Sequence, residues 1–201
     1  MSMRELLIAT HNRQKLSEMQ ALLGDAPFTL LTVDDVGFDH DFRVDEAGRT
    51  FEGNALIKAF VCAKKSGKLS LGEDSGLEVD ALDGRPGVYT KRYAEGTPDN
   101  GHAKLLAELK DVPDEKRGAQ FRSVVAIYDP ANDRVRICEG VARGVITRRA
   151  RGAAGFGQDP IFEYEGTGKT GGEMTPEEKN AVSHRGKSFA HVRDVLVAEF
   201  V

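Results

Sequence analysis

The sequence predicts an α/β protein in which a long mixed central β-sheet is flanked by helices, in two lobes with a cleft between them. Three observations lead to this prediction. The chain opens with a strand–helix–strand pattern, its middle carries two long strand-like runs joined by a turn, and a helix near its end has a clear cap signal. A length of 201 residues fits a single domain of two lobes, residues 1–201.

The opening pattern consists of two apolar runs on either side of a helix. Arg4 to Thr10 reads as a buried strand, and Asn12 then caps a helix that ends near Gly24. The apolar positions of that helix have helical spacing: Leu16, Met19, Leu22 and Leu23. Phe28 to Val33 reads as the second strand, so the two strands are expected to pair in parallel.

Residues 34 to about 109 predict a loop, two helices and, between the helices, a strand or a hairpin. Residues 34–49 are acidic and lack periodicity, which indicates a loop, and a helix is expected from Thr50 to Lys65. LSLGEDSGLEVDAL, residues 69–82, alternates like a strand or a hairpin. A further helix is expected from Asp99 to about Leu109.

The second half predicts a hairpin and a capped helix. AQFRSVVAIYDP and DRVRICEGVARGVIT read as two strands joined at residues 129–133. Thr175 is followed by Pro176 and by Glu178, which is the signature of a capping box with proline at the first helical position. A last helix carries the apolar residues Phe189, Val192, Leu196 and Phe200.

Composition narrows the classes of function. A net charge of −4 argues against a basic nucleic-acid-binding surface, and no apolar run approaches the roughly 20 residues of a membrane helix. Cys62 and Cys138 lie far apart and form no CxxC pair, so we expect free thiols and no cysteine-based zinc site. We therefore expect a cytoplasmic protein, without a signal peptide, that binds neither membrane nor nucleic acid.

Two segments in the first half carry residues suited to phosphate chemistry. The turn from Thr10 to Lys15 places a helix N-terminus beside a lysine, which suits a phosphate but also describes an ordinary capped helix. Asn54 and Lys58 lie one helical turn apart, and Lys58 either points into a cleft or extends to solvent. GTGKT at residues 166–170 is not a phosphate-binding P-loop, because the required earlier glycine is replaced by Glu163.

Two segments in the second half could bind a flat or an anionic group. Phe156 lies between glycines in AAGFGQDPIF, so it either presents its ring to a flat ligand or packs in a tight turn. Lys179, His184 and Arg185 lie close together in the chain, which fits a phosphate, the polar edge of a base, or a solvated helix end. Nearer the middle of the chain, Glu73 and Asp74 are adjacent carboxylates that repel each other, so a folded protein rarely places them side by side without a reason, and the local sequence leaves open what holds them.

Taken in order, these motifs resemble those of one family. TxNxxK, NAxxKA, DSG, LxGxPGxY, FGxDPIF and EMTPEEKNxxSHR all occur from Leu6 to about Leu196. The sequence resembles the Ham1/inosine triphosphate pyrophosphatase family, the purine nucleoside triphosphate pyrophosphatases that remove deaminated nucleotides. It departs from the family pattern at His11, where glycine is usual, and at Gln158, where an aromatic residue is usual.

The resemblance implies a role for each matching residue. The triphosphate would be held by the turn Thr10, His11, Asn12, Arg13, Gln14 and Lys15, and by Lys58 reaching from the second lobe. Mg²⁺ would be held by Glu46, Glu73 and Asp74. Asp74 would also act as the general base, and Ser75 would contact the substrate. The base would be bound by Phe156, Gly157, Gln158 and Asp159 on one side and by Lys179, His184 and Arg185 on the other.

The implied activity is hydrolysis of dITP, ITP and XTP to the monophosphate and pyrophosphate by a Mg²⁺-dependent homodimer. Two alternatives stay open from the sequence. One is a pyrophosphatase for other modified nucleotides, and the other is a nucleotide-binding sensor without catalysis.

Overall fold

The computed structural model describes residues 3–39, 41–94, 96–97 and 101–201. The chain divides into two compact units. Unit 1 comprises Met1–Asp74, Ser123–Glu139 and Ser188–Val201, and unit 2 comprises Ser75–Arg122 and Gly140–Lys187. The expected cleft between two lobes stays a prediction. No helix in the described ranges is long and apolar enough to cross a membrane.

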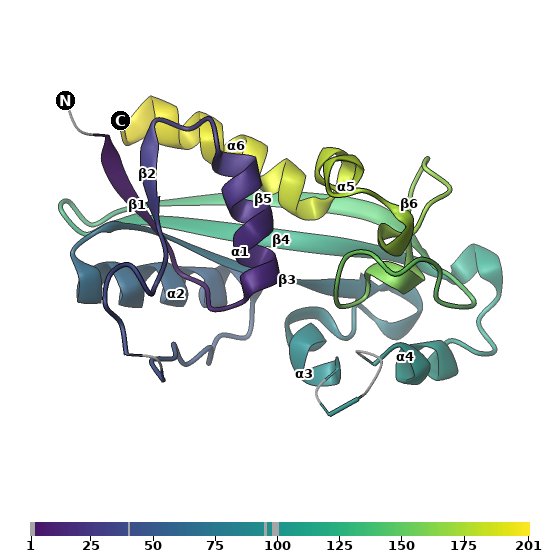
Figure 1. The fold of residues 1–201 in the computed structure, drawn as a ribbon. Coiled ribbons are helices and arrows are strands. Elements are labelled where there is room, and N and C mark those ends of the chain that lie inside the picture. The colour runs from purple at the N-terminus through teal and green to yellow at the C-terminus, as the bar shows by residue number, and fades with distance from the viewer. Residues whose placement is uncertain (1–2, 40, 95, 98–100) are drawn as a thin grey trace. The chain divides into compact units, whose positions relative to one another are not determined.

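The strands form one mixed sheet with the order β2-β1-β3-β4-β5-β6 (Figure 1). Their bounds are β1 Arg4–Ile8, β2 Phe28–Leu31, β3 Leu69–Val79, β4 Gly118–Asp129, β5 Arg134–Ile146 and β6 Phe162–Tyr164. β1 pairs in parallel with β2 and with β3, whereas β5 and β6 are antiparallel. The predicted α/β class, the parallel opening and the hairpin of β4 and β5 are therefore confirmed.

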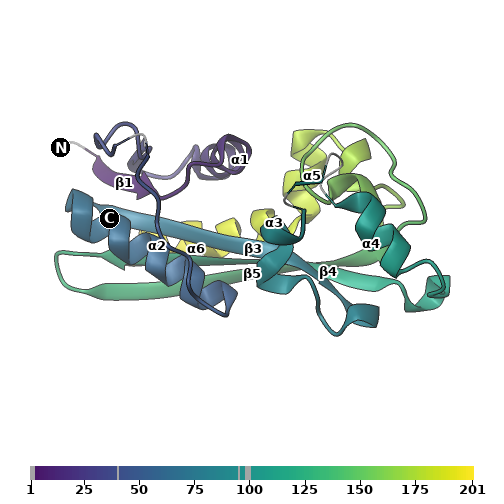
Figure 2. The same cartoon turned by 90° about the horizontal axis from the view of Figure 1, so that it is seen from below.

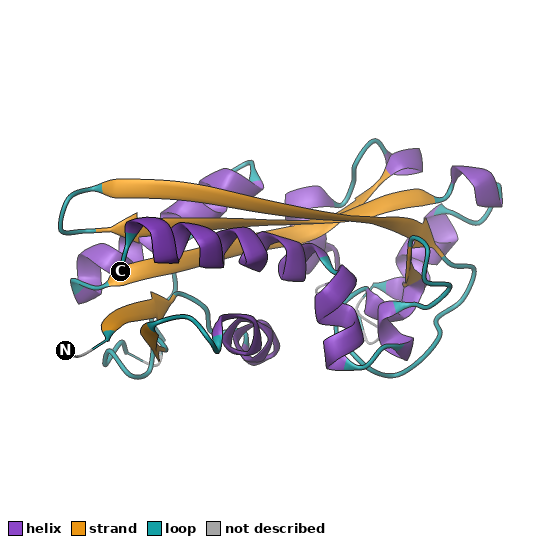
Figure 3. Cartoon of the chain, turned by 90° about the horizontal axis from the view of Figure 1, so that it is seen from above, coloured by secondary structure: helices purple, strands orange, loops and turns teal. Residues whose placement is uncertain are grey.

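In unit 1, helices cover both faces of the strands. The helices are α1 Arg13–Leu23, α2 Phe51–Ser66 and the larger part of α6 His184–Glu199. Side chains alternate along β1, so Leu6 and Ile8 join a core cluster with α1 and α6, while Leu7 packs with Cys62 of α2. Figure 1 shows α2 and α6 on opposite sides of the strands, and Figure 3 shows α6 running along them.

The helix ends of unit 1 follow the cap signals in the sequence. The Asn12 side chain accepts hydrogen bonds from the backbone N–H groups of Gln14 and Lys15, and the Thr50 hydroxyl accepts one from Gly53. α2 ends at Gly67, which has a φ of 70° that glycine adopts without strain. The predicted boundaries of both helices therefore agree with the structure to within a residue or two.

The EDSG segment is not a turn. Residues 69–79 form the single strand β3, so the hairpin alternative is wrong and Glu73 and Asp74 lie within the strand. Nine of its eleven residues are buried. Gly72 explains this close packing, because a Cβ there would lie only 2.4 Å from the Ala55 carbonyl oxygen of α2. Figure 2 shows α2 lying along β3.

Unit 2 has its own core around the remaining strand residues and short helices. The helices are α3 Thr90–Ala94, α4 His102–Glu108 and α5 Pro176–Val182, with short 3-10 turns η1 Asp80–Leu82, η2 Gly87–Tyr89, η3 Asp114–Lys116, η4 Asp159–Ile161 and η5 Gly171–Glu173. Leu77 of β3, Leu105 of α4 and Phe162 of β6 belong to one buried cluster. These contacts fix α4 and the segment after β5 to the same core.

Two helix predictions in unit 2 have different outcomes. The capping box of α5 is confirmed, because Thr175 and Glu178 exchange side-chain and backbone hydrogen bonds. The helix expected from Asp99 corresponds to α4, which begins at His102. Residues 99 and 100 lie outside the described residues. GTGKT lies in the turn after β6 and precedes η5, and no α-helix follows it directly.

Candidate functional site

The turn before α1 is organised by side-chain hydrogen bonds. Asn12 Oδ1 accepts from Gln14 N at 3.0 Å and from Lys15 N at 3.1 Å, and Thr10 Oγ1 accepts from Asn12 N at 3.2 Å. The Asn12 oxygen is thus used within the cap, which leaves the amide nitrogen as the donor that it can offer to a ligand. His11 and Arg13 are exposed at the same turn.

Lys15 is held against β3 by a buried carboxylate. Its Nζ lies 2.7 Å from Glu73 Oε2, and the Glu73 side chain is fully buried. Ser123 Oγ donates to the other carboxylate oxygen at 3.1 Å and lies 3.0 Å from Ser188 Oγ. This network, drawn from four elements of unit 1, fixes both the carboxylate and the ammonium group of Lys15.

Lys58 makes three polar contacts within unit 1. Its Nζ lies 2.8 Å from Glu46 Oε2 and 3.1 Å from Asp74 Oδ1, and it donates to the Glu73 carbonyl oxygen at 2.9 Å. The tight packing of α2 at Gly72 places Lys58 over these groups. The expectation that Lys58 would reach from the second lobe is not met, because Lys58 belongs to the same unit as Thr10 and Lys15.

Asp74 is a buried carboxylate with several partners. Asn54 Nδ2 donates to its Oδ2 at 3.0 Å, and Lys58 contacts its Oδ1. Burial raises the pKa of Asp74, while Lys58, Lys15 and the Asn54 hydrogen bond oppose that increase. Burial lowers the pKa of Lys58, but the carboxylates around it outweigh burial, so its pKa is raised overall. A carboxyl group with a raised pKa suits proton abstraction near neutral pH.

The carboxylates of this cluster are of the ligand type that binds magnesium, but they do not converge on one point as the ligands of a metal ion do. Glu46, Glu73 and Asp74 all offer carboxylate oxygens, the ligand type that Mg²⁺ prefers. Within the described ranges, no three Asp, Glu, His or Cys side chains gather closely enough to hold a metal ion. Lys15 contacts Glu73, and Lys58 contacts Glu46 and Asp74, so each of the three carboxylates lies beside a lysine. The three-carboxylate Mg²⁺ site stays a prediction.

In unit 2, Asp159 organises the loop that carries Phe156. Its Oδ2 accepts from Phe156 N at 2.7 Å and from Lys179 Nζ at 2.6 Å, and both charged side chains are almost fully buried. Lys179 Nζ lies 4.6 Å from the centroid of the Phe156 ring. Gly155 has a φ of 71°, and a Cβ there would lie 2.3 Å from Asp159 Oδ2, so this position needs glycine.

The start of α6 brings two more predicted residues to the same unit. Arg185 Nη2 donates to Ser75 Oγ at 3.1 Å, and its guanidinium carbon lies 5.8 Å from the Phe156 ring centroid. The His184 ring stacks on Phe121 at 4.7 Å with an interplanar angle of 18°. Arg185 is 1% exposed, so its guanidinium group can interact only with groups in the protein interior.

The structure therefore brings the predicted residues together in two groups. Unit 1 holds the residues from Thr10 to Lys15 and the cluster of Glu46, Lys58, Glu73 and Asp74. Unit 2 holds the remainder: Ser75, Phe156, Gly157, Gln158, Asp159, Lys179, His184 and Arg185. The peptide bond from Asp74 to Ser75 links the two groups in the chain.

Three contributing residues were not among the predicted site residues. Asn54 was noted only for its spacing from Lys58, and that spacing is the signal that could have identified it. Ser123 and Phe121 lie in β4, and nothing in their local sequence connects them to Glu73 or to His184. These contacts depend on strand pairing, which a local pattern does not encode.

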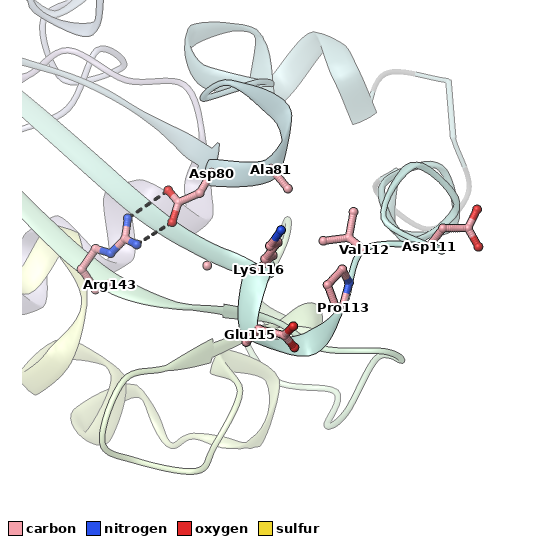
Figure 4. Close-up of a pocket in the computed structure, with 9 residues that line it drawn as sticks. Asp80, Ala81, Asp111, Val112, Pro113, Glu115, Lys116 and Arg143 are labelled. Carbon is pink, nitrogen blue, oxygen red and sulfur yellow. Dashed lines mark hydrogen bonds and ion pairs between the residues drawn. The ribbon is translucent and has the colours of Figure 1, made fainter.

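An open hollow in unit 2 belongs to neither group. Figure 4 shows it beside the bidentate ion pair of Asp80 and Arg143, whose nearest atoms are 2.6 Å apart, with Lys116 and Glu115 on its wall. Its nine lining residues include none of the predicted site residues.

Known proteins resemble this chain along almost its whole length. A dITP/XTP pyrophosphatase from Geobacter sulfurreducens is 46% identical over 196 residues, covering 96% of this chain and 97% of the relative. One from Pseudomonas aeruginosa is 44% identical, covering 96% and 98%. The solved structure of a HAM1 protein from Coxiella burnetii matches with a TM-score of 0.86 at 39% identity, covering 98% of this chain and all of that one.

The sequence model of the Ham1 family matches residues 6–195. This range runs from within β1 to within α6 and contains every residue of the two groups described above. Since the family model matches nearly the full chain, the curated relatives match it over nearly their whole length, and the solved structure shares its fold, the chain belongs to the Ham1 family.

Proposed function

We propose that the protein is a nucleoside triphosphate pyrophosphohydrolase that converts dITP, ITP and XTP to the monophosphate and pyrophosphate. The observation that carries this proposal is the cluster of Asp74, Lys58 and Glu73 in unit 1, where a buried carboxyl group with a raised pKa adjoins a lysine. The names of the Geobacter and Pseudomonas relatives support the same substrates. In the cell, this activity would keep deaminated purines out of the nucleotide pool.

In this proposal, the residues of unit 1 bind the triphosphate. The donors are the turn from Thr10 to Lys15, including the backbone at the start of α1, and the ammonium groups of Lys15 and Lys58. A helix N-terminus and lysines both stabilise phosphate oxygens. The lysines are already paired with carboxylates, so they can turn toward phosphate only if another cation compensates those carboxylates.

We propose that this cation is Mg²⁺ and that Glu46, Glu73 and Asp74 hold it. The three carboxylates lie around Lys15 and Lys58, and carboxylate oxygens are the ligands that Mg²⁺ prefers. Bound Mg²⁺ would neutralise phosphate charge and lower the pKa of a coordinated water. Asp74 accepts the proton of the water that attacks the α-phosphorus, and Lys15 and Lys58 stabilise the charge of the departing pyrophosphate.

The residues of unit 2 bind the base in this proposal. Phe156 stacks on the purine, and the loop of Gly157, Gln158 and Asp159 forms the wall around it. Arg185 and His184 donate to the 6-oxo group of hypoxanthine or xanthine, with Lys179 supporting the loop. Adenine carries a 6-amino donor instead, which would leave these buried donors unpaired and is disfavoured by roughly 10⁴-fold in comparable sites.

We further propose that the protein works as a homodimer in the cytoplasm, without a nucleic-acid partner. The family resemblance supports the dimer, and the two buried free thiols, Cys62 and Cys138, fit a reducing compartment. Sedimentation of the purified protein tests the dimer, and a single species at the monomer mass would contradict it.

The chemistry is tested by incubating the protein with dITP and separating the products by anion exchange. We expect dIMP and pyrophosphate in equal amounts with Mg²⁺ present, and no turnover after chelation with EDTA until Mg²⁺ is restored. Release of orthophosphate, or full turnover in EDTA, would mean that the bond cleaved or the cofactor has been assigned wrongly.

A further inference from the structure

We propose that His102 is a positioning residue for purine binding, which it supports by holding the loop that carries Phe156. This inference rests on the proposed function, because it takes Phe156 as the residue that stacks on the base. His102 is not one of the motif residues that match the family, and its role follows from its contact in unit 2.

The contact joins the first residue of α4 to the loop. His102 Nε2 lies 2.7 Å from the carbonyl oxygen of Gly157. A carbonyl oxygen only accepts hydrogen bonds, so Nε2 carries the proton and donates. Gly157 directly follows Phe156 and has a φ of 59°, a conformation that other residues adopt only with strain. The hydrogen bond therefore stabilises the loop next to its aromatic residue.

α4 provides a rigid base for this hydrogen bond. Leu105 lies within α4 and Leu109 directly follows it, and both are fully buried in the core of unit 2. Arg117, which is 2% exposed, donates from Nη1 to the Leu109 carbonyl oxygen at 2.6 Å. The same guanidinium donates to the carbonyl oxygens of Ile146 and Thr147 at the end of β5. The C-terminal end of α4 is thus fixed to the sheet.

The loop is held from two sides. The N–H of Phe156 donates to Asp159 Oδ2 at 2.7 Å, and the carbonyl of Gly157 accepts from His102. Asp159 is itself held by Lys179, so that side of the loop is fixed within the interior. The hydrogen bond from His102, the first residue of α4, holds Gly157, which directly follows Phe156 in the loop. Without it, the loop would lose the polar contact that ties the residue after Phe156 to α4.

The test compares two substitutions of equal length. His102→Gln retains a side-chain N–H donor, whereas His102→Met removes it, and both residues are tolerated in a helix. His191→Met is the matched control, because His191 Nδ1 also lies 3.0 Å from a backbone carbonyl oxygen, that of Glu139, but in unit 1. KM and kcat for dITP are measured for each variant, together with inhibition by inorganic triphosphate, which has no base.

For His102→Met we expect KM for dITP to rise roughly three- to tenfold, as for the loss of one hydrogen bond, with kcat within about twofold of the wild type. Inhibition by inorganic triphosphate should be unchanged, and His102→Gln and His191→Met should behave like the wild type. An unchanged KM in His102→Met would overturn the proposal, as would an equal loss in the Gln and Met variants.

Amide hydrogen exchange in residues 153–158 separates this inference from the proposed function. His102→Met should speed exchange in this loop, and His102→Gln should not, whatever reaction the enzyme catalyses. If the wild type fails to hydrolyse dITP, the proposed function is wrong and the exchange rates alone decide the role of His102. Unchanged exchange in the Met variant would refute its positioning role.

Discussion

Asp74 shows how two opposing influences set the properties of a single carboxyl group. Burial raises its pKa, and the neighbouring Lys58 and Lys15 limit that rise. Without the lysines, burial alone would raise the pKa of Asp74 further, whereas an exposed carboxyl group would be a weaker base. The buried position of Asp74 within β3 raises its pKa. Asn54 and Lys58, which contact separate oxygens of the carboxylate, lower it.

We expect Asp74→Asn to reduce turnover severely while preserving the fold. The amide has nearly the same shape and can still accept from Asn54 or Lys58, but it cannot take a proton from water. The expected loss in kcat is on the order of 10²–10⁴-fold, with the thermal unfolding midpoint changed by only a few degrees. Steady-state kinetics and calorimetry measure both quantities. Near wild-type turnover would show that another group activates the water.

The pH dependence of kcat/KM should report the raised pKa of Asp74. The base must be ionised, so activity falls as pH decreases through that pKa, and the acid limb should lie above the usual aspartate value of about 3.9. A pH profile of dITP hydrolysis measures this limb. The residual activity of Asp74→Asn should lack it. An acid limb that persists unchanged in the variant would assign the limb to a different group.

At the scale of elements, the contact between α2 and β3 determines where Lys58 lies. A Cβ at Gly72 would lie 2.4 Å from Ala55 O and 2.6 Å from Ala59 N, both backbone atoms of α2. Backbone atoms of a buried helix cannot yield as a flexible side chain does. The absence of a side chain at position 72 is therefore what allows the helix to approach the strand.

We expect Gly72→Ala to destabilise the protein by about 1–3 kcal/mol, because the helix must move away from the strand. For a chain of this length, that change lowers the unfolding midpoint by roughly 2–12 °C. Turnover should also fall, since Lys58 moves with α2. Thermal unfolding and a dITP assay measure the two effects.

Gly24→Ala is the matched control for this substitution. A Cβ at Gly24 would find its nearest neighbours at 3.6 Å, and the residue has a helical φ of −53°. Its stability should change by about 0.5 kcal/mol or less, or increase slightly. If both variants unfold at the wild-type temperature, the close approach at Gly72 does not control the packing of α2.

The helices were more predictable than the central strand. Asn12, Thr50 and Thr175 act through hydrogen bonds within three residues, so the sequence marks each helix start directly. In β3, Gly72 and the adjacent carboxylates indicate a turn as readily as a strand. The strand is favoured because α2 packs on Gly72 and because Lys15 and Lys58 pair with the carboxylates of Glu73 and Asp74. Both the helix and the lysines come from other segments of the chain.

At the scale of the whole molecule, the order of the site residues along the chain does not show which of them belong to the same unit. Unit 1 draws on three separate stretches and unit 2 on two, so residues close in sequence are assigned to different units and distant ones to the same unit. Ser123 and His102 were not predicted because each contacts a residue from a distant stretch of the chain, Glu73 and Gly157 respectively. The motifs nevertheless identified the family, because their order along the chain is independent of how the chain folds.

The proposed reaction and base preference are both tested by the turnover of dITP beside that of dGTP and dATP, at equal concentrations and with Mg²⁺, with the products identified by anion exchange. We expect rapid conversion of dITP to dIMP and pyrophosphate, with dGTP and dATP cut far more slowly. Equal turnover of dGTP, or orthophosphate as the product of dITP, would contradict this expectation.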